Sequence, residues 1–380
     1  MGKKIYILTL GATFMFSNAG TFLQHWALRK TLYKMGHMPV RVALPRDCVH
    51  IAINNFSWII SFVKRIVLVF LHYIGFSKYA KQEALNIKSF RNYIQARKFR
   101  KDYISNIGEC IEDTGVQADV LILGGDQVFT NEFKYLTEIL ASKIISFAAS
   151  TDWIKNAELK NWREEVKQKL QYLSKVGVRE QAGIKVLKDF EIESTKVADP
   201  VMLMNYEDLM SLAGKKQIFK NPTLFVYLLN ISSKEGLRIE DMTLISNELE
   251  CKLRMHGIQG AQYFIPSEYY LSLGPTEFVR AILDSKYLIT NSYHGTVIAL
   301  MLHKPFITVI QDNADVFTQN IRQKELLDFV GLEHHRININ EISTKGKFLL
   351  NEHVDWNKID DILNDFRLFS LNWLKEAIDN

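Results

Sequence analysis

Residues 287–300 read YLITNSYHGTVIAL, and this stretch decides the fold class. Its apolar start predicts a buried strand over Tyr287–Thr290, its polar middle a tight turn, and its apolar end a helix that Gly295 opens. Strand, turn and helix in this order form the unit of parallel α/β sheets. His294 then lies where open α/β sheets bind ligands, and its ring can exchange a proton near neutral pH. We therefore predict a functional role for His294.

The same turn offers groups suited to an anion. Asn291, Ser292 and Tyr293 supply polar side chains. Backbone N–H groups at the start of the helix, at Gly295 and Thr296, attract phosphate or carboxylate, and the glycine lets a ligand approach closely. We predict that these five residues bind substrate.

Short apolar runs and longer mixed stretches alternate along the whole chain, which predicts two sets of parallel strands with crossover helices. The polar stretch 205–222 separates the sets. We predict an N-terminal Rossmann-like lobe over residues 1–204, a C-terminal Rossmann-like lobe over 205–350, and a helix over 351–380 that packs back towards the first lobe. The predicted strands cover residues 5–10, 40–43, 120–123, 143–147, 175–178 and 196–198, then 223–229, 262–265, 287–290 and 306–310.

Composition is that of a globular protein. Of the 380 residues, 47% are hydrophobic and 23% charged, and this length favours two domains. The net charge of +5 is far below that of a dedicated nucleic-acid binder, so we expect no nucleic acid among the partners. Cys48, Cys110 and Cys251 are far apart, which argues against disulfides and a structural zinc site and favours a cytoplasmic setting.

The N-terminus imitates a signal peptide, because two lysines precede the apolar residues 5–16. A turn and a helix-like stretch follow directly, which favours a buried first strand instead.

Residues 56–74 are apolar enough to suggest a spanning helix, but Lys64 and Arg65 would each cost about 2.5–3.5 kcal/mol within a bilayer. Basic side chains gather downstream, over residues 78–101. Residues 56–101 therefore form a helical insert that either packs on the first lobe or contacts the inner face of the plasma membrane.

Two further strand-to-helix turns carry candidate residues. Asn18 and Gly20 suit a strained turn at a helix start, which can hold an anion or a hydroxyl. Gly124 and Gly125 make a tight turn whose amides can face a ligand. Asp126 and Gln127 follow them, and Asp126 either accepts hydrogen bonds from sugar hydroxyls or caps the next helix.

Charged residues end two more strands. The guanidinium of Arg179 can hold a carboxylate or phosphate in bidentate fashion, or pair with Glu180 or another acid. Pro200 holds Asp199 in an extended conformation, which suits a hinge or a site carboxylate.

Common catalytic signatures are absent from the sequence: it has no GxGxxG, Walker-type, HExxH or GxSxG motif. Their absence argues against a nicotinamide oxidoreductase, a kinase, a zinc protease and a serine hydrolase. We expect no metal and no cofactor at the site.

Taken in order, these stretches resemble the bacterial polysaccharide pyruvyl transferase family over residues 5–310. No single motif is decisive, but their fixed order is specific. The matching segments are NAGTFLQ at 18–24, GGDQVF at 124–129, ISFAAS at 145–150, VRE at 178–180, DP at 199–200, GPTEF at 274–278, NSYHGT at 291–296 and KPF at 304–306.

The resemblance implies a fold like that of B-type glycosyltransferases, with phosphoenolpyruvate bound as co-substrate in the cleft between the lobes. It implies His294 as the proton-transfer residue and Arg179 as a ligand of the donor's charged end. We expect Asp126 and Asn18 to orient the acceptor. Many members carry an arginine where this chain has Ser292. We expect Lys304 to supply the positive charge in its place.

The activity that the resemblance implies is transfer of a pyruvyl group onto sugar hydroxyls, with ketal formation. The acceptor would be a lipid-linked or nucleotide-linked saccharide intermediate of capsule or exopolysaccharide biosynthesis. Two alternatives stay open: a B-type glycosyltransferase that uses a nucleotide sugar, and a non-enzymatic saccharide-binding or scaffold protein on the same fold.

Overall fold

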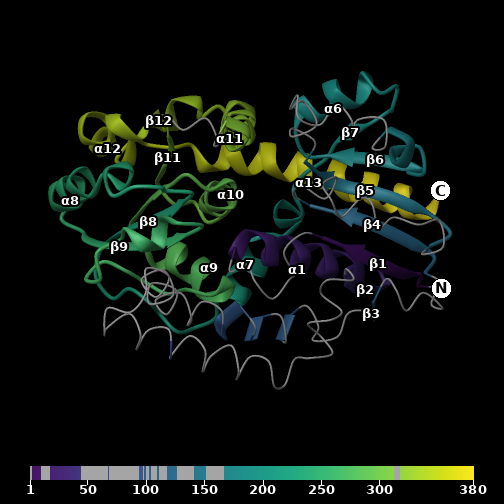
Figure 1. Ribbon diagram of the computed structural model, residues 1–380, viewed down its shortest axis with the longest axis horizontal. Helices are drawn as coiled ribbons and strands as arrows, with labels where there is room; N and C mark the ends of the chain where they lie inside the picture. Colours follow the sequence, from purple (N-terminus) through teal and green to yellow (C-terminus); the bar gives the residue numbers. More distant parts are fainter. Residues whose placement is uncertain are drawn as a thin grey trace.

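The computed structural model contains two parallel β-sheets with helices packed on them (Figure 1). It describes residues 2–9, 18–43, 67, 94–96, 98–99, 102–103, 109–110, 118–125, 141–150, 167–311 and 317–380. The predicted fold class, α/β with two Rossmann-like lobes, is confirmed.

The first sheet has the strand order β3-β2-β1-β4-β5-β6-β7, and all of its neighbours pair in parallel. Parallel strands buried on both faces need continuous apolar runs, which β4 and β5 have. The bounds are β1 Lys4–Leu8, β2 Met38–Ala43, β3 Glu109–Cys110, β4 Val120–Gly124, β5 Ile144–Ala149, β6 Lys175–Val178 and β7 Thr195–Lys196.

The second sheet has the order β12-β11-β10-β8-β9 and is also parallel throughout. Its strands begin after the predicted joint at residues 205–222. The bounds are β8 Thr223–Leu229, β9 Lys252–Ile258, β10 Tyr287–Thr290, β11 Phe306–Ile310 and β12 Arg336–Asn338.

One predicted strand is wrong. Residues 262–265 begin with the 3-10 helix η7 (Ala261–Tyr263), and the strand lies earlier, at β9. Polar residues alternate with apolar ones at the start of this edge strand, so it lacks the continuous apolar run on which the prediction relied. The short edge strands β3 and β12 carry too little pattern to be predicted.

Helices cover both sheets and begin at capping residues. The side chain of Asn18 accepts the amide of Gly20 at the start of α1 (Ala19–Lys34), and Asn205 and Asp208 form a capping box at the start of α7 (Tyr206–Ala213). In the described part of the first lobe, the helices with given bounds are α1 Ala19–Lys34 and α6 Gln181–Lys188, followed by η5 Pro200–Leu203. Those that follow are α7 Tyr206–Ala213, η6 Glu235–Leu237, α8 Ile239–Glu248, α9 Pro275–Asp284, α10 Tyr293–Met301, α11 Phe317–Val330, η9 Glu333–His335, η10 Ile339–Glu341, α12 Ile342–Leu350 and α13 Trp356–Asp379.

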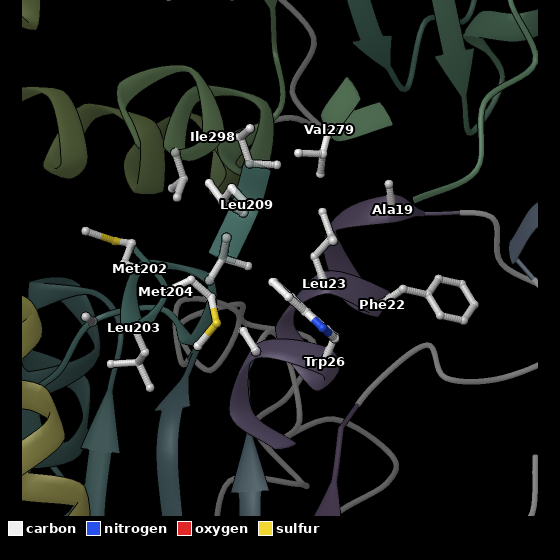
Figure 2. Close-up of a cluster of buried hydrophobic side chains, with 14 of the residues drawn as sticks. Ala19, Phe22, Leu23, Trp26, Met202, Leu203, Met204, Leu209, Val279 and Ile298 are labelled. Atoms are coloured by element: carbon white, nitrogen blue, oxygen red, sulfur yellow. The ribbon is translucent and has the colours of Figure 1, made fainter. Parts of the chain in front are cut away.

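A continuous apolar core joins the lobes. Leu23 of α1 belongs to the same buried cluster as Val279 of α9, Ile298 of α10 and Met202 of η5 (Figure 2). Side chains from the two lobes therefore pack together in one hydrophobic core.

Helix α13 crosses from the second lobe back to the first (Figure 1). Its Ser370 Oγ accepts a hydrogen bond from the amide of Ala198 at 2.8 Å, and the ring of Trp373 packs 6.2 Å from that of Phe147 in β5. A bulkier residue at Gly177 in β6 would meet the Trp373 ring. The last helix thus fastens the far side of the first sheet to the second lobe.

No helix in the described ranges is both long and apolar enough to cross a membrane. Most of the predicted insert at residues 56–101 lies outside the described residues.

Candidate active site

His294 lies in the first turn of α10, at the carboxyl edge of the second sheet. The turn before it is held by its own polar residues. Ser292 caps the helix, because its Oγ accepts the amide of Gly295 at 3.2 Å. Asn291 bonds both the amide and the carbonyl of Leu229 at the end of β8. The sequence YLITNSYHG therefore builds a rigid corner that directs the imidazole towards the first lobe.

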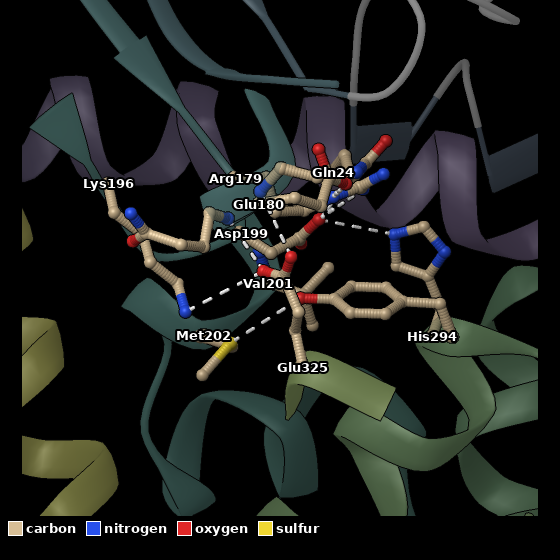
Figure 3. A network of polar contacts seen from close by, with 12 residues as sticks. Gln24, Arg179, Glu180, Lys196, Asp199, Val201, Met202, His294 and Glu325 are labelled. Carbon is tan, nitrogen blue, oxygen red and sulfur yellow. Dashed lines mark hydrogen bonds and ion pairs between the residues drawn. The ribbon is translucent and has the colours of Figure 1, made fainter. Parts of the chain in front are cut away.

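Asp199 of the first lobe faces His294. The Nε2 atom of His294 lies 3.5 Å from Oδ2 of Asp199. A dashed line marks this contact in Figure 3. Asp199 caps η5 with its other oxygen, which accepts the amide of Val201 at 2.9 Å. Its side chain is fully buried. The carboxylate is therefore held in a fixed position by the protein.

Two hydrogen-bond donors and the imidazole of His294 converge on the same oxygen of Asp199. Besides His294, Gln24 of α1 donates from Nε2 at 2.6 Å and Arg179 donates from Nη1 at 3.0 Å (Figure 3). Burial raises the pKa of the Asp199 carboxyl, but the charges of His294 and Arg179 and the bond from Gln24 outweigh it. The net effect holds this pKa well below its usual range, so Asp199 stays ionised.

Arg179 is the centre of a buried ion-pair group. Its Nε donates to Glu180 at 2.7 Å, its Nη1 to Asp199, and its guanidinium carbon lies 4.6 Å from the centre of the Tyr293 ring. The alternative that the sequence left open, an ion pair with Glu180 or another acid, is what the structure contains. Two carboxylates of the protein thus pair with the guanidinium. That Arg179 binds the charged end of the pyruvyl donor stays a prediction.

Gly20, in the first turn of α1, lies against the other side of His294. A Cβ atom at position 20 would stand 2.2 Å from Nδ1 of His294. The start of α1 and the start of α10 therefore meet at this imidazole. Each helix start carries a partial positive charge from its dipole, so together they favour an anion.

A small cavity adjoins the ion-pair group and has a volume of about 20 Å³, which is room for about one water molecule. Across it, Glu325 of α11 accepts the amides of Gln181 and Ala182 at the start of α6, at 2.6 and 3.0 Å. This carboxylate ties the second lobe to the first. The loops that follow β1, β4 and β5 are largely outside the described ranges.

The glycine pair Gly124 and Gly125, at the end of β4, is linked to the ion-pair group by the side chain of Gln24. A Cβ atom on Gly125 would lie 3.0 Å from Cδ of Gln24, and Gly124 packs against Leu28. Asp126 and Gln127 lie outside the described residues.

Two expectations for the helix start and the second charge are corrected. The amides of Gly295 and Thr296 donate to Oγ and O of Ser292, so they do not form an open anion seat. Lys304 donates to the carbonyls of Leu283 and Ser285 at the end of α9. It precedes β11, at the opposite edge of the sheet from His294, because β10 and β11 run in parallel.

Gln24 and Glu325 were not predicted as site residues. Gln24 ends the NAGTFLQ segment, which was recognised as a motif in the sequence. The hydrogen bond from Gln24 to Asp199 was not predicted. Nothing near Glu325 in the sequence marks it, because its bonds are to a helix in the other lobe.

The fold and this site define a two-lobed α/β protein of glycosyltransferase-B-like architecture. A putative UDP-N-acetylglucosamine 2-epimerase from Listeria monocytogenes superposes with a TM-score of 0.54 at 9% identity, over 100% of this chain and 96% of that one. The UDP-GlcNAc 2-epimerase from Methanocaldococcus jannaschii gives 0.51 at 11% identity, over 97% and 99%. At these identities the likeness concerns the fold alone.

The family model of polysaccharide pyruvyl transferases matches residues 18–313. The chain belongs to the polysaccharide pyruvyl transferase family, as the ordered motifs predicted. No curated protein matches it in sequence.

Proposed function

We propose that this protein transfers the pyruvyl group of phosphoenolpyruvate to hydroxyl groups of a saccharide. The observation that carries the proposal is the position of His294, held between the buried carboxylate of Asp199 and the first turn of α1 at Gly20. Family membership supports the same reaction.

Asp199 sets the orientation of the imidazole. A carboxylate beside Nε2 stabilises the tautomer with its proton on that nitrogen, as the acid of a catalytic triad does for its histidine. Nδ1 then faces the start of α1 and is the atom that exchanges protons with the substrate. The burial of Asp199 keeps its charge effective, because little water screens it.

The reaction balances with one proton shuttled by His294. Protonated Nδ1 gives its proton to the methylene carbon of phosphoenolpyruvate, and an oxocarbenium-like centre forms at the adjacent carbon. A sugar hydroxyl adds there and its proton returns to the imidazole. Phosphate leaves, a second hydroxyl adds at the same carbon, and its proton passes to the departing phosphate, which closes the ketal and releases hydrogen phosphate. Proton transfer by a placed side chain supplies about 10²–10⁴-fold of the rate.

The anionic ends of the donor need positive surroundings. The start of α1 supplies them, because its dipole favours negative charge and Gly20 lets the imidazole lie against this turn. We propose that Asn18, which caps this helix, and Asp126 orient the acceptor. Arg179 acts indirectly, because its hydrogen bond holds Asp199 in position beside His294.

We propose a saccharide intermediate of bacterial capsule or exopolysaccharide assembly as the acceptor, bound at the cytoplasmic side. The apolar and basic residues 56–101 suit a lipid-linked acceptor at the inner membrane surface. Retention of acceptor binding when membranes are removed would count against that location.

Incubation with phosphoenolpyruvate and a galactose- or mannose-type acceptor, followed by mass analysis, tests the reaction. We expect addition of a pyruvyl group and release of one phosphate per product. A thermal-shift panel separates the alternative: stabilisation by nucleotide sugars and none by phosphoenolpyruvate would show a glycosyltransferase instead.

A further inference from the structure

A cluster of metal-binding side chains lies in the second lobe, away from His294. His334 and His335 end the short helix η9, and Glu352 follows α12. The Nε2 atom of His334 lies 3.1 Å from Oε1 of Glu352, and Nε2 of His335 lies 3.6 Å from Oε2. Two imidazoles thus face the two oxygens of one carboxylate.

The hydrogen bond at Nδ1 of His335 leaves its other ring nitrogen, Nε2, to face Glu352. Its Nδ1 lies 2.8 Å from the carbonyl oxygen of Phe306, which can only accept, so Nδ1 carries a proton. The ring is 1% exposed, so water has little access to it. A neutral ring with its proton on Nδ1 presents a lone pair at Nε2.

That lone pair points at another one. Nε2 of His335 and Oε2 of Glu352 are both buried and have no hydrogen-bond partner in the described part of the chain. Two acceptors that face each other at 3.6 Å repel unless a cation lies between them. A cation between Nε2 and Oε2 would give both buried atoms a partner.

We propose that His334, His335 and Glu352 bind one divalent transition-metal cation of the Zn²⁺ type. Bonds of about 2.0–2.1 Å in tetrahedral geometry put ligand atoms roughly 3.3 Å apart. The observed separations of 3.1 and 3.6 Å lie on either side of that value. Imidazole nitrogens select zinc, copper or nickel over calcium and magnesium. The Phe306 carbonyl is the outer partner that orients a ligating histidine.

The site would be structural. Phe306 begins β11, and its register with Leu288 of β10 places it at the edge of the sheet opposite to the His294 turn. The cation would join η9 to the segment between α12 and α13, just before the long helix that crosses to the first lobe. His334 is exposed, so it gives the ion an entry path, and water can complete its coordination.

Titration of the full-length, tag-free protein with Zn²⁺ after chelator treatment tests the proposal. We expect one ion per chain, and Co²⁺ at the same stoichiometry should give the visible bands of four-coordinate cobalt. His334→Gln and Glu352→Gln should weaken Zn²⁺ binding at least about tenfold. Neither side chain is in the core, so both variants should fold.

His353→Gln is the matched control, because His353 is an exposed histidine next to Glu352 and lies outside the cluster. It should leave the affinity for Zn²⁺ and the stoichiometry unchanged. Zn²⁺ should raise the Tm of the parent and of this control, and not that of Glu352→Gln. Equal Zn²⁺ affinity in all of these variants, or no saturable binding in the parent, overturns the proposal.

Discussion

A Cβ atom on Gly20 would stand 2.2 Å from Nδ1 of His294, although the two residues belong to different lobes. Only glycine at position 20 allows the imidazole to lie on the first turn of α1 with its Nε2 towards Asp199. We propose this contact as the place where the two lobes assemble the proton-transfer site.

Gly20→Ala should therefore displace the imidazole. A misplacement of about 1 Å can cost on the order of 10² in rate, so we expect a loss of that size in kcat with little change in Tm. The measurement is steady-state pyruvyl transfer. Gly236→Ala is the control, since the nearest atom to an added Cβ there is 3.5 Å away. Equal activity of both variants would show that ring position is not limiting.

His294→Ala should lower turnover by about 10²–10⁴ with folding intact. His303→Ala is a matched control, because His303 also faces a carboxylate, that of Asp360 at 2.9 Å, but at the surface. Pyruvyl transfer by both variants should be compared at saturating donor. Unchanged turnover in His294→Ala would remove the imidazole from the mechanism.

Asp199→Asn should reduce kcat on the order of 10² or more, because the histidine loses the charge that orients it. It should also shift the pH profile of kcat, which a purely structural change would not do. Asp360→Asn, at the surface pair with His303, is the control and should leave both readouts unchanged. A pH profile identical to that of the parent would argue against a positioning role.

The same carboxyl predicts a response to acid. Its pKa in the folded state is below the unfolded value of about 3.9, so its contribution to stability is present above that value and is lost as pH falls further. The free energy of unfolding should be measured with denaturant at several pH values between about 5 and 3. It should fall less with decreasing pH in Asp199→Asn than in the parent.

His256 predicts a second pH effect. Burial lowers its pKa to about 4, although Nδ1 bonds the carbonyl of Leu271. The unfolded chain takes up this proton near pH 6.5, so stability is full above that pH and is lost as pH falls towards 4, by on the order of 3 kcal/mol. His256→Phe keeps a ring against Tyr227 and should unfold with a shallower pH dependence. The same slope in both proteins would contradict this.

Leu23→Ala should test the core between the lobes. Leu23 is fully buried in the cluster of Figure 2, and such a truncation costs about 2–5 kcal/mol. Leu368→Ala on the exposed face of α13 should stay within about 0.5 kcal/mol. Urea unfolding measures both. Separate transitions for the two lobes in the parent would contradict a shared core.

Much of the fold was predictable because apolar periodicity and turn chemistry are local. The stretch NSYHG gave a capped corner at the end of β10, as expected from its polar residues before glycine. β9 was missed because polar residues interrupt its apolar run at the edge of the sheet. The positions of Arg179 and Asp199 at strand ends were also predicted, but their pairing was one of two alternatives.

The amino-acid sequence by itself determined the two parallel sheets, the family and the histidine corner, because each depends on residues close together along the chain. Only the tertiary structure decided which charges are used inside the protein. Gln24 reaches Asp199 across 175 residues, and Glu325 reaches the start of α6 across 144. The partner of a buried charge is whichever group the packed elements bring within a few ångströms, and no local pattern records that distance.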